Sequence, residues 1–175
     1  MVGRAGGRAG CLAALVCALW MWAAAGTARA AVEVSGGAYA GTGEAGFHVA
    51  VWVRPEGSPY TTWRFGGRLQ QDGNASSGAV EASVLYDPPA FQPPRGLGAL
   101  RMTTRPYGGA GAEVLWQSAG GSTASGGSLY ALVGVRQSLD ASRWLWIEVR
   151  YSVAQWGGQA QARARVVGGF GLRWQ

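Results

Sequence analysis

The chain has 175 residues, a formal net charge of +6 and a sequence pI near 10.0, and 48% of its residues are hydrophobic. Its two cysteines, Cys11 and Cys17, both lie in the first 30 residues, so the rest of the chain has no disulfide and no thiol chemistry. This excludes the class of small secreted domains that disulfides hold together. His48 is the single histidine, so neither a metal site nor another cofactor is expected.

Residues 1–30 have the organisation of a cleaved signal peptide. The first eight residues include two arginines and no acid, residues 11–25 form an uncharged apolar run, and an A-x-A site ends at Ala30. The alternative is a retained membrane anchor, but the apolar run is shorter than the roughly 18 residues that a spanning helix needs. The sequence therefore predicts a signal helix that directs export, followed by a mature domain of residues 31–175.

Removal of this leader reduces the positive charge of the chain. Three of the fifteen basic residues leave with it, and twelve arginines then face nine acids, so the net charge falls from +6 to +3. A net charge of this size is weak evidence for binding to nucleic acid. No nucleic-acid partner is therefore expected.

The mature chain alternates apolar and polar residues with a period of two, which is the signature of half-buried strands. The alternation is clearest from residue 143 to residue 153, where Ile147 and Val149 fall on one face and Glu148 and Arg150 on the other. Eight segments show it well and one, residues 32–40, shows it weakly. In chain order they are 32–40, 47–54, 63–70, 80–86, 100–105, 112–116, 129–136, 143–153 and 161–174.

Glycine, proline, asparagine and aspartate mark the connections between these segments. The predicted connections are 55–59, 71–78, 87–96, 106–109, 120–127, 139–142 and 155–159. Eight strands that begin near Ala45 give the even number of a bacterial membrane barrel. Residues 32–40 are then either an N-terminal lead-in or a sign that a later strand has been divided in two. We expect an all-β fold, a closed antiparallel up-and-down barrel of eight strands, with eight to ten possible.

The alternation alone does not say which face lies inside the barrel. A soluble barrel buries the apolar face, whereas a membrane barrel turns it toward lipid and fills its interior with polar residues. The apolar faces here are nearly free of charge, and the strands are close to the 9 to 11 residues that cross a bilayer. Both features favour the membrane arrangement, with arginines and glutamates paired inside. The residues expected inside are Arg64, Arg68, Glu81, Arg101, Glu113, Arg136, Glu148, Arg150, Arg163 and Arg165.

Aromatic residues near the strand ends support the same arrangement, because tryptophan and tyrosine gather at membrane interfaces. The aromatic residues expected at the interfaces are Trp63, Tyr86, Trp116, Tyr151 and Trp174.

Four segments in the C-terminal half, residues 106–111, 130–136, 146–151 and 168–174, look like the closing strands of small outer-membrane β-barrel domain proteins. The resemblance extends over roughly residues 97–175. It implies a place in the outer membrane, contact with the bilayer and with lipopolysaccharide-type lipids, and recognition of the last strand by the barrel-assembly machinery. The family typically ends on an aromatic residue, whereas Gln175 follows Trp174 here.

The sequence carries little that indicates catalysis. His48 lies within a strand, on the polar face, and a general base needs a partner within hydrogen-bond reach that the sequence does not supply. We expect His48 to be bonded to a glutamate or an arginine, and the protein not to be an enzyme. The glycine-rich residues 108–111 and 168–171 lack the Lys-Ser/Thr of a phosphate-binding loop.

An eight-stranded barrel is only wide enough for its own side chains, so a wide pore is not expected. The sequence instead predicts a structural, adhesive or surface-binding role, exerted through the loops at 87–96 and 120–127. Two alternatives stay open. One is a secreted soluble barrel that binds a small apolar ligand, and the other is a lipid-modifying enzyme of the outer membrane.

Overall fold

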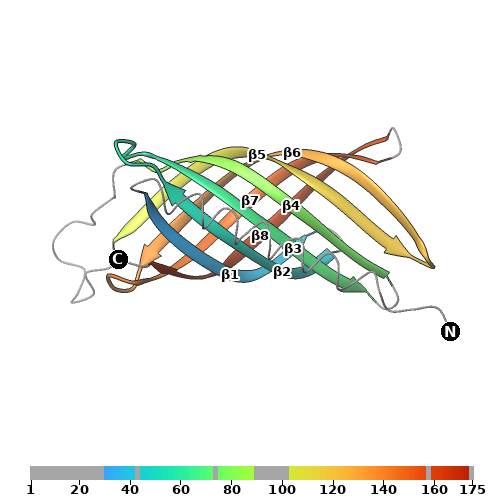
Figure 1. The fold of residues 1–175 in the computed structure, drawn as a ribbon, viewed down its shortest axis with the longest axis horizontal. Coiled ribbons are helices and arrows are strands. Elements are labelled where there is room, and N and C mark those ends of the chain that lie inside the picture. The colour runs from blue at the N-terminus through green and yellow to red at the C-terminus, as the bar shows by residue number, and fades with distance from the viewer. Residues whose placement is uncertain (1–29, 42–43, 73–74, 89–102, 157–158, 174–175) are drawn as a thin grey trace.

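The computed structural model describes residues 30–41, 44–72, 75–88, 103–156 and 159–173. These residues form eight strands: β1 (Ala31–Gly41), β2 (Glu44–Arg54), β3 (Thr61–Asp72), β4 (Ala75–Tyr86), β5 (Thr104–Ala119), β6 (Ser122–Ser138), β7 (Arg143–Trp156) and β8 (Gln159–Arg173). Each strand pairs antiparallel with its neighbours in sequence, and β8 pairs with β1, so the sheet closes into a barrel (Figure 1). Within these ranges no helix is long and apolar enough to cross a membrane.

The expected fold class is therefore correct, but the predicted strands need two corrections. Residues 32–40 are not a lead-in, because they belong to β1 and pair with both β2 and β8. The predicted segment 112–116 is part of the longer strand β5, which already begins at Thr104. The predicted segment 100–105 contributes Thr104 and Arg105 to the same strand, and residues 100–102 lie outside the described residues.

The predicted turn at 106–109 does not exist, since all four residues lie within β5 and pair with β6. Proline at position 106 suggested a turn because it cannot donate a backbone hydrogen bond. In the barrel, the pairing of β5 with β4 begins only at Gly108, so Pro106 lies at an edge on that side, where proline is tolerated.

The two ends of the barrel differ in their connections. At one end, here the hairpin end, two residues separate the strands of each of the pairs β1–β2, β3–β4, β5–β6 and β7–β8. The other end of the barrel is called the terminal end here. It holds the connections β2–β3, β4–β5 and β6–β7, the start of β1 and the end of β8. Gly120 and Gly121 form the β5–β6 turn with positive φ angles of 58° and 84°, a conformation that favours glycine.

This arrangement corrects several predicted loops. Residues 122–127 belong to β6, residues 75–78 to β4, and Gln155 and Trp156 to β7. Asp87 follows β4 at the terminal end, whereas the Gly120–Gly121 turn lies at the hairpin end. The two segments expected to carry the surface-binding role, 87–96 and 120–127, therefore begin at opposite ends of the barrel. Residues 89–96 lie outside the described residues.

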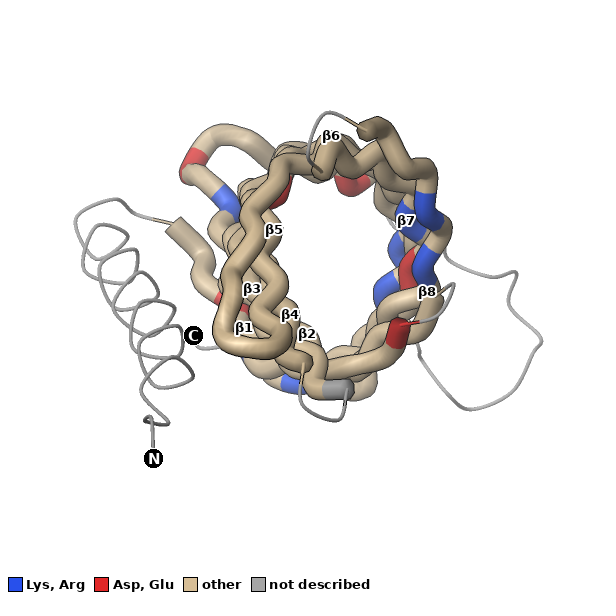
Figure 2. Tube along the Cα trace, turned by 90° about the vertical axis from the view of Figure 1, so that its right-hand side faces the viewer, with Lys and Arg blue, Asp and Glu red and all other residues tan. Residues whose placement is uncertain are grey.

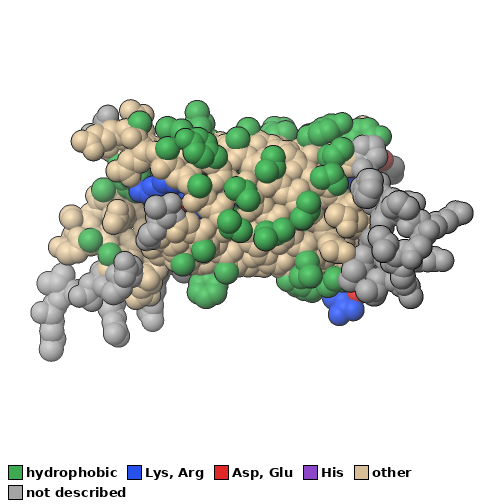
Figure 3. Space-filling model, turned by 180° about the vertical axis from the view of Figure 1, so that it is seen from behind, with side chains coloured by type: hydrophobic (Ala, Val, Ile, Leu, Met, Phe, Trp, Pro, Cys, Tyr) green, Lys and Arg blue, Asp and Glu red, His purple; other side chains and the backbone are tan. Residues whose placement is uncertain are grey.

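The outer surface of the barrel is apolar along most of its height. Hydrophobic side chains are spread over its wall (Figure 3), and several large ones are more than half exposed, including Phe47 at 76% and Leu129 at 70%. The exposed side chains on β7 are Leu145, Ile147, Val149, Tyr151 and Val153. The alternating strand residues Trp144, Trp146, Glu148, Arg150 and Ser152 are buried.

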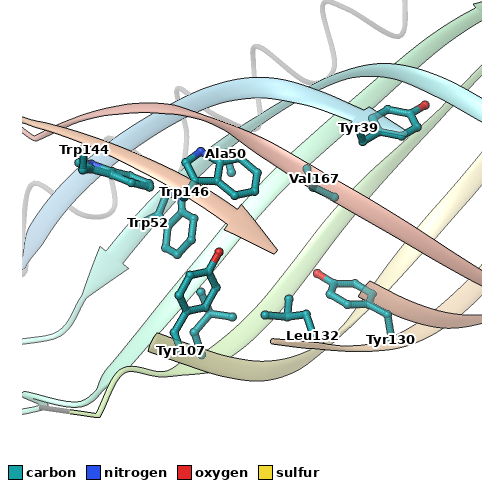
Figure 4. Packing of buried hydrophobic residues seen from close by; sticks show 10 residues of the cluster. Tyr39, Ala50, Trp52, Tyr107, Tyr130, Leu132, Trp144, Trp146 and Val167 are labelled. Carbon is teal, nitrogen blue, oxygen red and sulfur yellow. The ribbon is translucent and has the colours of Figure 1, made fainter. Parts of the chain in front are cut away.

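The barrel interior combines charged residues with aromatic ones. Trp52, Trp144, Trp146 and Tyr107 belong to one buried cluster (Figure 4), and the ring of Trp52 packs edge-on against each of the other three at centroid distances between 5.1 and 6.2 Å. Glycine makes room for them, because a Cβ on Gly171 would lie 2.1 Å from the indole of Trp144. The interior is therefore filled by bulky side chains from several strands.

Candidate functional site

Charged side chains, most of them buried, lie at three levels along the barrel, whose strands form a ring in the end-on view of Figure 2. The terminal layer consists of Glu33, Arg54, Asp87, Arg136 and Arg173. The central layer consists of His48, Arg64, Glu81, Glu148 and Arg150. The hairpin layer consists of Glu44, Arg68, Glu113, Arg163 and Arg165. Each layer is held by ion pairs between strands that are distant in the sequence.

The central layer is a closed network of two arginines and two glutamates. Arg64 Nη1 donates to Glu148 Oε2 at 2.7 Å, and Arg150 forms ion pairs with both Glu148 and Glu81. The hydroxyl of Tyr107 donates to the same Oε2 of Glu148 at 2.7 Å. Opposite charges thus balance within this layer, which is what burial of charged groups requires.

His48 belongs to this central layer. Its Nε2 lies 2.9 Å from Glu81 Oε1 and 3.1 Å from Arg150 Nη2, and its ring meets Trp146 edge-on at 5.6 Å. The expectation that His48 bonds to a glutamate or an arginine is confirmed. Because only 1% of His48 is exposed, the ring is closed off from any substrate in solution.

The terminal layer is built around Arg136. Its guanidinium lies over the rings of Trp52 and Trp144, at 4.9 and 5.0 Å from their centroids, and donates to Glu33 at 2.7 Å and to Asp87 at 3.1 Å. Arginine is suited to this position because its planar group stacks on aromatic faces while its edge forms hydrogen bonds.

Asp87 receives three donors in this terminal layer. Thr62 Oγ1 donates at 2.6 Å and Arg54 Nη2 at 2.7 Å, in addition to Arg136. Burial alone would raise the pKa of the Asp87 carboxyl, but Arg136, Thr62 and Arg54 together lower it below its ordinary value. The carboxyl is therefore held in its charged form.

The hairpin layer lies beneath an open cavity of about 600 Å³ at the hairpin end. This cavity, here the vestibule, is lined by Tyr39, Glu44, Arg68, Gln70, Trp156 and Arg163, among others. Below it, Arg68 and Arg165 each lie 3.2 Å from Glu113, and Arg165 also pairs with Glu44. These ion pairs form the floor of the vestibule and separate it from the centre of the barrel.

The side chains in the central part of the barrel leave almost no surface accessible to water. Arg64 is 0% exposed, Glu148 and Trp52 are 1% exposed, and Trp144 is 2% exposed. Among the described residues, no water-filled channel therefore passes through the central layer.

The structure places most of the residues that were expected inside the barrel in these layers. Eight are buried: Arg64, Arg68, Glu81, Glu113, Arg136, Glu148, Arg150 and Arg165. The side chain of Arg163 is 29% exposed at the vestibule, and Arg101 lies outside the described residues.

The residues expected at the membrane interfaces lie on the outer surface where they are described. Trp63 and Tyr86 are 44% and 58% exposed near the terminal end, and Tyr151 is 58% exposed on β7. Trp116 is partly buried because its ring lies across Gly78 of the neighbouring strand. Trp174 lies outside the described residues.

Sequence reasoning missed part of the network. Glu33 was assigned to a lead-in, Asp87 to a loop, and Glu44 fell before the predicted strand, yet all three are acidic partners of interior arginines. The alternation already placed Trp52, Trp144 and Trp146 on the polar face. Because the polar face was expected to point inward, this position could have predicted that these tryptophans fill the interior.

Comparison with known proteins shows the fold. No family model matches the chain, and no curated protein matches it. The crystal structure of Neisserial surface protein A is similar with a TM-score of 0.56 and 13% identity, over 83% of this chain and 96% of that one. The N-terminal β-barrel domain of Pseudomonas aeruginosa OprF is similar with a TM-score of 0.53 and 10% identity, over 82% of this chain and 97% of that domain.

These likenesses confirm, at the level of fold, the resemblance to small outer-membrane β-barrel domain proteins. The chain is a closed eight-stranded barrel of that type, with an apolar outer wall and a charged, filled interior.

Proposed function

We propose that this protein is exported by a cleaved signal peptide and spans the outer membrane as a sealed barrel with a structural, adhesive or surface-binding role. The observation that carries the proposal is the inverted polarity of the barrel. Apolar side chains such as Phe47 and Leu129 face outward, while the charges of Arg64 and Glu148 are fully enclosed. Lipid can solvate the outward apolar side chains, and ion pairing offsets the cost of burying the interior charges.

The height of the apolar wall supports a membrane location. On β7 the outward side chains are apolar from Leu145 to Val153, whereas Arg143 and Gln155 flank them. Nine residues of a tilted strand match the roughly 9 to 11 that cross a bilayer. Trp63 and Tyr86 near one edge, and Trp116 nearer the other, suit the two interfaces.

A soluble barrel that binds an apolar ligand is less well supported. Such a barrel needs an apolar lumen and a polar surface, the reverse of the arrangement found here. The lumen holds the charged layers, and its aromatic residues pack against one another and against arginines. An exposed apolar surface of this extent on a soluble protein would lead to association.

A lipid-modifying enzyme is also less well supported. His48 is the single candidate base, and it is enclosed by Glu81, Arg150 and Trp146. A substrate would have to displace the central ion-pair network to reach it.

With periplasmic termini the hairpin end faces outward from the cell, and any surface role would be exerted there. This orientation departs from the usual pattern of short periplasmic turns and longer outer loops, because the hairpin end has the shorter connections. The two-residue turns mean that strand-borne side chains, rather than long loops, would make the contacts. The exposed residues at the β5–β6 tip are small and uncharged, among them Ser122, Thr123, Ala124 and Ser125. The proposed lipid partners, including lipopolysaccharide-type lipids, would contact the apolar wall, and the assembly machinery would contact β8.

Fractionation tests the membrane location. Cells that express the full chain should yield the protein in the outer-membrane fraction, extractable by detergent but not by salt or carbonate. In mild detergent the unboiled protein should migrate differently from the boiled one on a gel. A mature protein that is soluble without detergent would overturn the proposal.

Reconstitution tests the sealed interior. The purified barrel in a planar bilayer should give no sustained conductance, because the central layer closes the lumen. A stable open conductance in the wild-type protein would contradict this part of the proposal.

A further inference from the structure

The hairpin layer below the vestibule has more arginines than carboxylates. Among its described side chains, three arginines face two glutamates, the same excess as in the terminal layer, whereas the central layer has two of each. The hairpin layer differs from the terminal layer in opening onto the vestibule. One oxygen of Glu44 is shared by Arg163 at 3.5 Å and Arg68 at 3.7 Å, and its other oxygen is bound by Arg165. The contacts of Arg163 and Arg68 with Glu44 are long, so they leave donor capacity for an anion.

One buried nitrogen of a lining residue adds to this capacity. Arg68 Nε has no hydrogen-bond partner among the described atoms. An unpaired donor of this kind is costly when buried, and an anion in the vestibule would place an acceptor close to it. The polar part of the vestibule lining is therefore suited to an anionic group.

Part of the vestibule lining is apolar. Leu115 of β5 and Trp156 of β7 both line it, and behind them Leu115 packs with Ala79 and Ala154 in a small buried cluster against which Trp156 lies. The lining thus combines arginines with apolar, partly aromatic side chains. A volume of about 600 Å³ lies within the range of small-molecule sites.

The rim of the vestibule is lowest over the β1–β2 hairpin. The pairing of β1 with β8 stops at Gly41 and Arg165, whereas β8 extends six residues further, to Gln159. Arg163 lies in this extension and lines the cavity. Its side chain is 29% exposed, so an entering ligand can reach it.

We propose that the vestibule binds an amphiphile that carries a phosphate or similar anionic group next to an apolar body. Arg163 and Arg68 bind the anion, and Trp156 and Leu115 contact the apolar part. The anion can come from a lipid headgroup that enters over the low rim or from a dissolved molecule. This inference goes beyond the proposed function, because it assigns a specific ligand site to a barrel for which a structural, adhesive or surface-binding role is proposed.

Calorimetric titration in neutral detergent tests the site, with phenyl phosphate and inorganic phosphate as the probes. Phenyl phosphate should bind the wild-type barrel at least tenfold more tightly than inorganic phosphate, since its ring adds contact with Trp156. Arg163→Gln should weaken phenyl phosphate at least tenfold. The matched control is Arg143→Gln, which removes an exposed arginine paired with Asp140 at the opposite end and should leave binding unchanged.

A gel of unboiled samples first establishes that both variants are folded. Trp156→Ala then provides a second variant, and it should weaken phenyl phosphate while leaving inorganic phosphate unchanged. The proposal is overturned if the wild type gives no binding heat with phenyl phosphate at millimolar concentration, or if Arg163→Gln and Arg143→Gln bind equally well.

Spin-labelled lipids distinguish the two sources of the anion. In vesicles of phosphatidylcholine with a trace of labelled phosphatidylglycerol, the wild type should immobilise a fraction of the label that Arg163→Gln releases if a lipid headgroup is the ligand. If that fraction is equal in the two proteins while phenyl phosphate binding differs, the ligand comes from solution. Either result supports the site.

Discussion

Arg64 of β3 and Glu148 of β7 join strands that lie four places apart in the eight-strand ring, so their 2.7 Å ion pair spans the lumen. Neighbouring strands are already joined by backbone hydrogen bonds. A pair between opposite walls instead fixes the diameter and cross-section of the barrel. Both side chains are fully enclosed, so removal of one partner leaves a buried charge without compensation.

Replacement of Glu148 by glutamine should therefore strongly destabilise the barrel. Arg64, Arg150 and Tyr107 all bind this carboxylate, and loss of its charge should lower the free energy of unfolding by about 3 to 5 kcal/mol. Urea titration in detergent micelles measures the effect. Glu56→Gln, at an exposed turn position, is the control and should change stability by less than about 0.5 kcal/mol. Equal stability of the two variants would show that the central network does not hold the barrel.

The stability cost of an arginine on the outer wall should depend on its position along the barrel axis, and thus on its depth in the bilayer. Val149 lies at the middle of the apolar side chains of β7 and is 50% exposed, so Val149→Arg should cost about 2 to 4 kcal/mol in lipid vesicles. Ser125→Arg, on the outer face beyond the apolar wall, should cost less than about 1 kcal/mol. Refolding yield and urea titration in vesicles measure both. A neutral effect at Val149 would count against a membrane environment.

Alanine substitution at two adjacent glycines of β1 should have different effects on the stability of the barrel. A Cβ on Gly37 would lie 2.1 Å from the carbonyl oxygen of Gly168, so Gly37→Ala should force the β1 and β8 backbones apart and cost about 1 to 3 kcal/mol. A Cβ on Gly36 would meet no atom within 4 Å, so Gly36→Ala should be neutral or slightly stabilising. Urea midpoints compare the variants, and similar losses for both would refute the close approach of these strands.

Asp87 should make part of the stability depend on pH. Because its pKa is lowered in the folded barrel, its ionised form favours folding. This contribution is fully present above the ordinary aspartate pKa of about 4 and is lost as the pH falls through the lower folded value. Asp87→Asn should therefore be less stable than the wild type at pH 7, and the difference should shrink below about pH 4. A difference that is equal at pH 7 and pH 3 would contradict this assignment.

The sequence alone supports the fold class, because alternation is a local property of each segment. The predicted number of eight strands agrees with the structure only because two errors cancel: β1 was left out, and β5 was counted as two strands. The boundaries around β5 could not be obtained this way. Pro106 and the glycines after it have the composition of a turn, and only the neighbouring strands β4 and β6 decide that they are extended. Similarly, β1 is poor in large apolar residues because Gly36 and Gly37 occupy its middle, so its alternation is weak.

For the candidate site, the sequence could predict which kinds of residue lie in the interior but not how they pair. The polar face of the strands already brought Arg64, Glu81 and Glu148 to one side of the sheet, but which arginine meets which glutamate depends on the tilt and closure of the barrel. The vestibule could not be predicted, since it results from strands of unequal length. Its low rim exists because β8 continues beyond the point where β1 ends.

The seam between β1 and β8 pairs Glu33 with Arg173, residues that are 140 positions apart. Each hairpin closes only a short loop, whereas this ladder joins the two ends of the barrel sequence and bears the largest loss of chain entropy on closure. Until then the edge of β1 carries unpaired backbone groups and glycines that offer little steric protection. A chain truncated before β8 would leave the edge of β1 unpaired. Such a chain should therefore self-associate rather than close into a smaller barrel.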